Sequence, residues 1–402
     1  MADTATRGPA LEDVRVLEFG SMLAGPFVGT LLADFGAHVI KAEKPGKPDA
    51  LREWPPHKGE TPLWWKSMAR SKRLITLDIS MPEGRAIALD LISRCDIVIE
   101  NFKPGTLERW GFDPAELAKR DPRTIWVRVS GFGQTGPYRH QGGYATIAEG
   151  FSGLASFTGF ADRGPMVSAF PLGDYLAGVF GAFGAMVALR ERERSGRGQV
   201  VDVSLYEPFL RIIESVVVRY DQTGRLKPRL GNQMEEDVPR NVYATADGGF
   251  VTISCGSERI FKNLLKAMGR ADLSADPRFA SMSMRVENRS AIDGIVAAWM
   301  RGQKVADALA ILEKNEVVAG RVNDMSDILG DPHVAAREAI TTLLDGELGP
   351  LRMPAPVPKL SATPGRVRWS GGKMGAHNQD VFAGLLGMSA DRLDELERQG
   401  II

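Results

Sequence analysis

The amino-acid sequence predicts an α/β protein with a parallel β-sheet in a large domain and a second, smaller α+β domain. Three observations support this prediction. The chain has 402 residues, which is too long for one simple hydrophobic core. Its first half alternates short apolar segments with helix signals, as βαβ proteins do. From about residue 220 the pattern changes to a hairpin signal followed by several helical segments.

Strand and helix signals alternate through the first half. Residues 14–19 predict a strand, Pro26 begins a helix in its first turn, and Gly36 ends that helix. Further strands are expected at 38–43, 74–77, 96–100 and 124–129, with a helix at 82–93. Strands that alternate with helices in this way form a parallel sheet covered by helices.

The second half predicts a separate unit and a return of the chain. Residues 241–253 indicate a hairpin around Asp247-Gly248, and helical patterns follow at 260–268, 292–300 and 305–314. The segment after Asp331 is rich in proline and glycine, which predicts an extended arm, and a last helix is expected at 390–398. We therefore assign residues 1–215, completed by 335–402, to the large domain and 225–330 to the small domain.

Composition excludes several functional classes. Hydrophobic residues make up 44% and charged residues 25% of the chain, as in ordinary globular proteins. The 50 basic side chains balance the 50 acidic ones, so we expect no nucleic-acid partner and no binding to anionic membranes. The two cysteines, Cys95 and Cys255, lie in apolar strand-like runs and are expected to be buried free thiols. No histidine pair has metal-ligand spacing, and no metal site is expected.

Targeting signals are weak in this chain. Residues 1–13 have no apolar core and contain three acidic residues, which argues against a secretory or transit peptide. The apolar run at 175–189 is short for a membrane span and predicts a core helix. These features predict a cytoplasmic protein.

Asp174 is the most informative single residue. It lies between Gly173 and Gly178, at the start of the apolar run. A carboxylate at this place can cap the helix by accepting backbone N–H bonds, which is the commoner role. It can also be a nucleophile that forms covalent acyl intermediates. The local sequence leaves both interpretations open.

Two glycine-containing turns and a few basic residues are weaker candidates. Residues 131–136 match G-x-G-x-x-G after a strand, but a loop follows where a dinucleotide site needs a helix. The first strand-to-helix turn, 19–26, suits either a ligand or tight packing. Basic residues at strand ends suit a phosphate-bearing ligand, although scattered surface charges are commoner: Lys44, Lys72, Arg73 and Arg109.

Several motifs occur in a fixed order from about residue 12 to the C-terminus. They are Val-Leu-Glu-Phe at 16–19 with Ala-Gly-Pro at 24–26, Gly-Ala-His-Val-Ile-Lys-Ala-Glu at 36–43, Ser-Lys-Arg at 71–73 with Leu-Asp at 77–78, Glu-Asn-Phe-Lys-Pro-Gly at 100–105, Ser-Gly-Phe-Gly-Gln-Thr-Gly-Pro-Tyr at 130–138, Asp174, and Thr-Ala-Asp-Gly at 245–248. Together they resemble the class III coenzyme A transferases, which include formyl-CoA transferase, carnitine CoA-transferase and 2-methylacyl-CoA racemase.

The resemblance implies a fold and a reaction. The fold is a Rossmann-like large domain plus a small domain, with two chains interlocked as a homodimer. The reaction moves CoA from an acyl-CoA donor to a small carboxylate acceptor, with the CoA thioester as substrate and no separate cofactor. Asp174 is then the nucleophile, forming an anhydride and an aspartyl-CoA thioester; its helix start keeps it ionised, and Gly173 and Gly178 leave room for CoA. The implied CoA contacts are Leu23, Ala24, Lys44, Leu77, Asp78, Asn101, Phe102, Arg109 and Trp110, with Lys44 and Arg109 on the phosphates.

The chain also departs from the family. The racemase branch has Gly-His-Asp where this chain has Gly143-Tyr144-Ala145, which argues against racemisation, with His140 as the nearby substitute. Residues 232–237 form an acidic segment where formyl-CoA transferase has glycines, and Leu23 replaces a polar residue, so formate and oxalate are poor candidates. The alternatives are a 2-methylacyl-CoA racemase acting by α-proton exchange, a nicotinamide-dependent dehydrogenase, and a non-catalytic CoA-binding scaffold.

Overall fold

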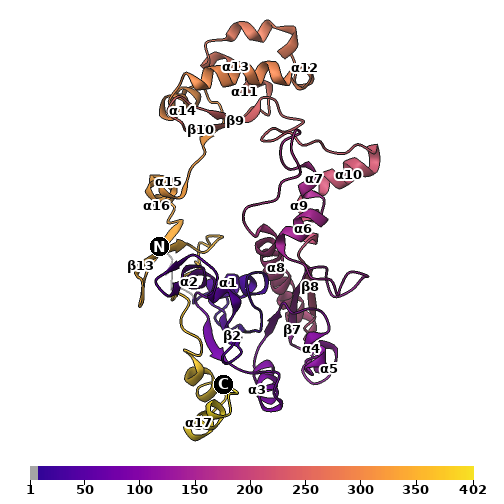
Figure 1. Ribbon diagram of the computed structural model, residues 1–402, viewed down its shortest axis with the longest axis vertical. Coiled ribbons are helices and arrows are strands. Elements are labelled where there is room, and N and C mark those ends of the chain that lie inside the picture. Colours follow the sequence, from indigo (N-terminus) through magenta and orange to yellow (C-terminus); the bar gives the residue numbers. More distant parts are fainter. Residues whose placement is uncertain (1–7) are drawn as a thin grey trace. The chain divides into compact units, whose positions relative to one another are not determined.

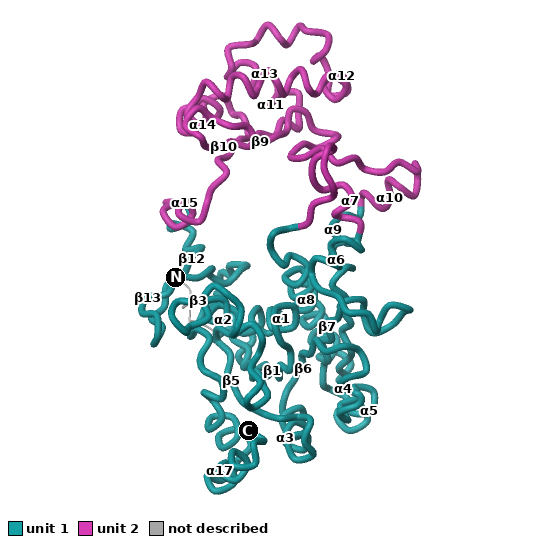
Figure 2. Tube along the Cα trace, in the orientation of Figure 1, with its two compact units in different colours: residues 1–152, 168–214, 333–402 teal, residues 153–167, 215–332 magenta. Residues whose placement is uncertain are grey.

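A computed structural model describes residues 8–402 and divides into two compact units (Figure 2). Unit 1 contains the described residues up to Ser152, together with Ser168–Glu214 and His333–Ile402. Unit 2 contains Gly153–Val167 and Ser215–Pro332. Residues 153–167, which the sequence analysis placed in the large domain, thus lie with unit 2. The segment for which no signal peptide is expected includes residues 1–7, which lie outside the described residues.

A six-stranded, fully parallel sheet forms the centre of unit 1 (Figure 1). Its order is β5-β2-β1-β6-β7-β8, and β1 pairs in register with both β2 and β6. The five predicted strands are present, and β8 is an additional edge strand that the sequence analysis did not predict. The bounds are Arg15–Glu18 (β1), His38–Glu43 (β2), Arg73–Thr76 (β5), Ile97–Glu100 (β6), Ile125–Ser130 (β7) and Val200–Ser204 (β8).

Helices cover this sheet and connect its strands. The predicted helices are α1 and α3, and the apolar run belongs to the longer α8. Short elements complete the unit. The bounds are Ala24–Asp34 (α1), Leu63–Met68 (α2), Pro82–Ser93 (α3), Thr106–Arg109 (α4), Pro114–Leu117 (α5), Ala145–Phe151 (α6), Leu172–Ser195 (α8), Glu207–Ile212 (α9), and the small strands His57–Lys58 (β3) and Thr61–Pro62 (β4).

Glycines let α8 pack closely against α1 and the sheet. A Cβ atom at Gly178 would lie 2.8 Å from Cδ1 of Phe27 and 3.2 Å from the carbonyl oxygen of Ala24. A Cβ atom at Gly184 would lie 2.5 Å from Cγ1 of Val201. The spacing of these glycines therefore serves the contact of α8 with α1 and β8.

One face of α8 remains uncovered in the chain. Val179, Phe183 and Val187 are exposed, and Phe183 keeps 65% of its surface. Within the described residues, α8 is the one helix that is long and apolar enough to cross a membrane by length and composition. The predicted core helix is thus packed on one side only.

The C-terminal arm completes the core of unit 1. Phe382, Leu396 and Ile401 pack in the same buried cluster as Ile75 and Leu91. The arm was predicted as extended, but it also contains a β-hairpin of β12 and β13. Its elements are Ile340–Asp345 (β12), Gly349–Pro354 (β13), a π-helical turn at Gln379–Ala383, and the last helix, Ala390–Arg398 (α17), at the predicted bounds.

Unit 2 is an α+β unit with its own core. Its three-stranded antiparallel sheet has the order β11-β10-β9, and the predicted hairpin forms β9 and β10. Phe261, Leu264, Val296 and Leu312 are buried in its core. The bounds are Leu154–Phe157 (α7), Glu214–Thr223 (α10), Arg240–Ala244 (β9), Phe250–Ser254 (β10), Glu258–Ala267 (α11), Met282–Glu287 (α12), Arg289–Arg301 (α13), Val305–Lys314 (α14), Ala319–Arg321 (β11), Met325–Gly330 (α15) and, at the border, Pro332–Ala336 (α16).

Gly178→Ala should destabilise the protein, because the added methyl group would collide with the Phe27 side chain and the Ala24 carbonyl oxygen of α1. Overpacking of this kind costs about 1–3 kcal/mol. Gly294→Ala in α13 is the control, since its Cβ atom would meet nothing within 4 Å and alanine favours helices. Urea unfolding followed by tryptophan fluorescence measures both variants. Equal stabilities of Gly178→Ala and wild type would contradict the close packing.

Candidate active site

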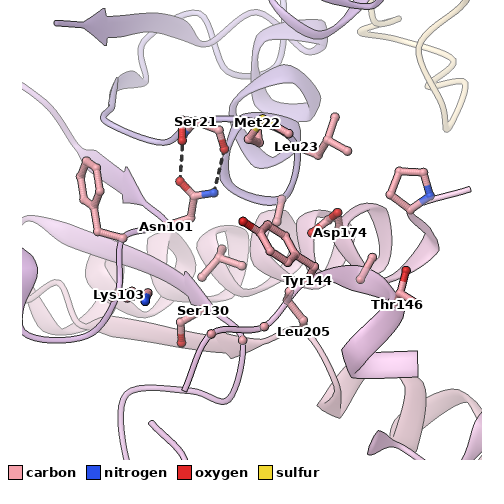
Figure 3. A pocket seen from close by; sticks show the side chains of 18 of the residues that line it. Ser21, Met22, Leu23, Asn101, Lys103, Ser130, Tyr144, Thr146, Asp174 and Leu205 are labelled. Atoms are coloured by element: carbon pink, nitrogen blue, oxygen red, sulfur yellow. Dashed lines mark hydrogen bonds between the residues drawn. The ribbon is translucent and has the colours of Figure 1, made fainter. Parts of the chain in front are cut away.

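A cavity of about 670 Å³ lies in unit 1, at the carboxyl ends of β1, β6 and β7 (Figure 3). This edge is where parallel α/β sheets bind their ligands. Five segments supply most of the lining, and Trp54 and Leu205 complete it. The segments are the β1–α1 turn (21–24), the β6–α4 loop (101–104), the end of β7 (129–131), residues 141–146, and the start of α8 with Pro171 and Asp174.

Asp174 lies in the first turn of α8 and faces this cavity (Figure 3). The N-cap residue is Pro171, and no side chain caps the helix, so the capping interpretation of Asp174 is wrong. Burial raises the pKa of the Asp174 carboxyl to about 6. Burial is thus the cause of the shift, and it opposes the charged form of this carboxyl. With a pKa near 6, the carboxyl is mostly ionised at neutral pH.

The β1–α1 turn is held in a strained conformation next to Asp174. Met22 has a φ of 64°, which side chains other than glycine rarely adopt. The Asn101 side chain accepts a hydrogen bond from the Ser21 amide and donates one to the Ser21 carbonyl, both at 2.8 Å (Figure 3). Asp49 Oδ1 accepts from the Met22 amide at 2.9 Å. These bonds place Leu23 and Ala24 in the cavity wall.

Buried charges beneath the turn support it. Lys41 Nζ donates to the Gly20 carbonyl at 2.6 Å and lies 2.8 Å from Asp49 Oδ2 and 3.2 Å from Glu18 Oε1. Burial opposes the charged form of Lys41, but the carboxylates of Asp49 and Glu18 outweigh it and raise the pKa. Lys72 Nζ lies 2.8 Å from Glu18 Oε2, and burial lowers its pKa to about 8. Lys72 is fully buried, so its interpretation as a phosphate ligand is wrong.

The structure brings four of the nine predicted CoA contacts into the cavity with Asp174. These four are Leu23, Ala24, Asn101 and Phe102. The other five, Lys44, Leu77, Asp78, Arg109 and Trp110, are not among the lining residues.

Each of these five has neighbours of its own. Lys44 Nζ pairs with Asp78 Oδ2 at 2.9 Å, and Leu77 is buried. Arg109 donates to Thr106 Oγ1 at 3.0 Å, and the Trp110 ring packs edge-on against Phe102 at 5.2 Å. Their role as CoA contacts stays a prediction.

Gly173 and Gly178 do not leave room for CoA, contrary to the sequence interpretation. A Cβ atom at Gly173 would lie 3.0 Å from the Phe209 ring and 3.1 Å from Cα of Ala145. Gly178 faces Phe27 in the same way. Both glycines therefore serve helix packing, and they position Asp174 indirectly.

The G-x-G-x-x-G motif forms a loop, and the next helix begins only at Ala145. A Cβ atom at Gly131 would lie 2.8 Å from Cα of Gly143, so this glycine allows two backbone segments to touch at the cavity. His140 accepts a hydrogen bond from Arg139 and is not among the lining residues. The arrangement lacks the strand–turn–helix geometry of a dinucleotide site.

Sequence reasoning missed several lining residues. Lys103 is the one cation among the residues that line the cavity, and Tyr144 and Thr146 add hydroxyl groups near Asp174. Lys103 lies just after β6, and Ser130 is the last residue of β7. A position at the carboxyl end of a parallel strand is the sequence signal that could have identified both residues, because ligands bind at this edge of the sheet. Across residues 8–402, no group of three or more His, Cys, Asp and Glu side chains could hold a metal ion.

Known proteins resemble this chain over nearly its whole length. The sequence model of CoA-transferase family III matches residues 11–378. Succinyl-CoA–D-citramalate CoA-transferase of Chloroflexus aurantiacus is 46% identical and covers 98% of each chain. The beta subunit of succinyl-CoA–L-malate CoA-transferase from the same organism is 38% identical over both full chains. A CAIB/BAIF family protein from Brucella suis has a TM-score of 0.84 and 32% identity, covering 94% of this chain and all of that chain.

Proposed function

This chain belongs to CoA-transferase family III, and we propose that it moves CoA from succinyl-CoA to a small hydroxydicarboxylic acid, with Asp174 as the nucleophile. That the chain is a CoA-transferase follows from its family and its relatives. The choice of donor and acceptor follows the two relatives from Chloroflexus aurantiacus, which are named for succinyl-CoA and for citramalate or malate. Acyl-CoA and carboxylate are therefore the substrate classes.

The proposed mechanism is supported above all by the position of the Asp174 carboxylate and by its lack of a bonding partner. Its carboxylate faces the cavity, caps nothing, and has a pKa raised by burial alone. An ionised carboxylate without hydrogen-bond donors keeps its electron pairs for attack on an acyl carbon. The buried carboxylates beneath the turn, by contrast, are paired with Lys41 and Lys72.

The proposed steps conserve the thioester bond energy. A carboxylate oxygen of Asp174 attacks the thioester carbonyl, the C–S bond breaks, and an anhydride and CoA thiolate form. The thiolate attacks the Asp174 carbonyl of the anhydride, the C–O bond breaks, and the donor acid leaves as a carboxylate. The acceptor carboxylate then reverses these steps on the aspartyl-CoA thioester. No net proton is taken up or released.

The start of α1 supports the charge that develops in these steps. The first N–H groups of a helix have no acceptor within it, and Leu23 offers no side-chain cap. Leu23 and Ala24 line the cavity together with Asp174. Free amides and the positive end of the helix dipole stabilise an oxyanion in such a position.

We assign CoA to the wall formed by residues 101–104 and to the turn at 21–24. Lys103 is exposed and lines the cavity, so it suits a phosphate or a second carboxylate. The predicted contacts outside the cavity lining remain part of this proposal: Lys44, Leu77, Asp78, Arg109 and Trp110. Lys44 would have to exchange its Asp78 partner for phosphate.

A racemase is not favoured. Racemisation at the α-carbon needs two opposed acid/base groups. Asp174 is the one carboxylate among the cavity-lining residues, and they include no histidine. Tyr144 and Ala145 occupy the positions of the racemase His and Asp.

We also propose an interlocked homodimer that works in the cytoplasm. Large apolar side chains are exposed on two separate helices, Phe183 on α8 and Val218 on α10, and such surface is typical of subunit interfaces.

The cysteines support the proposed cytoplasmic location. Cys95 and Cys255 are buried free thiols, as the sequence predicted, and such thiols are common in a reducing compartment.

Intact-protein mass spectrometry after mixing with succinyl-CoA tests the nucleophile. Wild type should gain the mass of CoA less one water, and hydroxylamine should remove it, because a thioester forms on a carboxyl group. Asp174→Ala should show no adduct. Asp202→Asn, which changes a carboxylate outside the cavity, should behave as wild type. An adduct on Asp174→Ala would exclude this mechanism.

The rate of adduct formation should fall in acid, because only the ionised carboxyl attacks. Since burial raises the pKa of Asp174 to about 6, protonation removes the nucleophile below that pH. From pH 7 to about pH 5 the single-turnover rate should fall about tenfold, while an aspartate with an ordinary pKa would lose little. Rapid-quench measurements over this range give the profile. A flat profile down to about pH 5 would contradict the raised pKa.

Light scattering after size exclusion tests the dimer. Wild type should have about twice the chain mass of 43.7 kDa. Phe183→Glu places a charge on the exposed apolar face of α8 and should shift the mass toward the single chain. Arg190→Glu, at the exposed polar end of the same helix, is the control and should leave the mass unchanged. A monomeric wild type would exclude the proposed assembly.

A further inference from the structure

We propose that Arg128 is a positioning residue for CoA, because its guanidinium fixes both ends of the cavity wall formed by residues 101–104. This inference rests on the proposed function, since it concerns the wall to which we assign CoA. Arg128 itself is not among the residues that line the cavity. It therefore acts on the ligand through the wall.

The guanidinium of Arg128 connects two carboxylates that flank the wall. Arg128 on β7 is the register partner of Glu100, the last residue of β6. Its Nε donates to Glu100 Oε1 at 2.6 Å, and its Nη1 donates to Glu108 Oε1 at 2.8 Å. Glu100 directly precedes the wall and Glu108 lies in α4 just after it. One side chain thus closes the β6–α4 loop at both ends.

Glu100 connects the Arg128 guanidinium to the cavity wall through the Phe102 backbone. Its Oε2 accepts a hydrogen bond from the Phe102 amide at 2.7 Å. The Phe102 ring packs edge-on against Trp110, which follows α4. The neighbouring Asn101 holds the Ser21 backbone of the opposite turn. Movement of Glu100 therefore changes the spacing of two cavity walls.

Burial makes this arrangement depend on arginine. Glu100 is 1% exposed and Arg128 is 6% exposed, so water cannot replace a lost partner. A planar guanidinium donates in two directions at fixed geometry, whereas a lysine ammonium is a single point on a flexible stem. A lysine at position 128 would keep the positive charge but would not hold Glu100 and Glu108 at the same time. Without the bridge, Glu100 and Glu108 repel each other and the loop loses its fixed ends.

The expected effect is on CoA affinity and not on the chemical step. Asp174 is positioned by the packing of α8 on α1, β7 and β8, whereas the Arg128 guanidinium bonds to Glu100 and Glu108 at the β6–α4 loop. Arg128→Lys should weaken CoA binding about tenfold and raise the KM for succinyl-CoA by a similar factor. The kcat at saturating succinyl-CoA should stay within about threefold of wild type, and the KM for the acceptor should not change.

Isothermal titration with free CoA and steady-state kinetics measure these values for Arg128→Lys. The matched control is Arg192→Lys. Arg192 is 11% exposed in its side chain and pairs at 2.9 Å with Asp96, just before the opposite end of β6. The control should bind CoA as wild type does. Equal CoA affinity of Arg128→Lys and wild type would overturn the inference.

Glu108→Gln provides a milder second test, since this side chain is 32% exposed and the Glu100 bridge remains. Hydrogen exchange of residues 102–110 should become faster in this variant, with thermal stability nearly unchanged. Unchanged exchange would also overturn the inference. If the wild-type protein neither binds CoA nor forms the Asp174 adduct, the proposed function itself fails. That outcome is separate from the results for the Arg128 and Glu108 variants.

Discussion

The buried ammonium of Lys41 is the charge on which the shape of the cavity depends. It lies under the β1–α1 turn, where it joins Glu18 of β1 to Asp49 and holds the Gly20 carbonyl. Asp49 in turn fixes the strained Met22 backbone. Loss of one partner in such a buried network costs about 3–5 kcal/mol, because it leaves a charge without compensation.

A buried cation also holds the opposite wall of the cavity, which is the β6–α4 loop. Arg128 compensates Glu100 and Glu108 below the β6–α4 loop, and Asn101 ties this loop to the β1–α1 turn. Two walls of the cavity are thus stabilised by polar contacts that reach between separate strands. Rigid walls lower the cost of ordering a long, flexible ligand such as CoA.

Asp174 differs from the carboxylates around it. Glu18, Asp49 and Glu100 are all paired with cations, and that pairing is what makes them structural. Asp174 is partly buried and lacks such a partner, and burial raises its pKa. A carboxylate that the fold neither pairs nor bonds is costly for stability and useful for chemistry. The glycines beside it serve a different purpose, since they let α8 pack deeply enough to bring Asp174 to the cavity.

The amino-acid sequence alone determined the parallel α/β fold, the bounds of α3, α14 and α17, and the family, because these depend on local periodicity and ordered motifs. It did not predict β8 or the β12–β13 hairpin, whose residues become strands through pairing with a partner strand. Only the tertiary structure decided which basic residues are free. Lys72 meets Glu18 from 54 positions away, and Lys44 meets Asp78, so neither pairing is visible in a local pattern. The partner of a side chain is set by how distant segments pack, and that partner decides whether the residue stabilises the fold or remains available to a ligand.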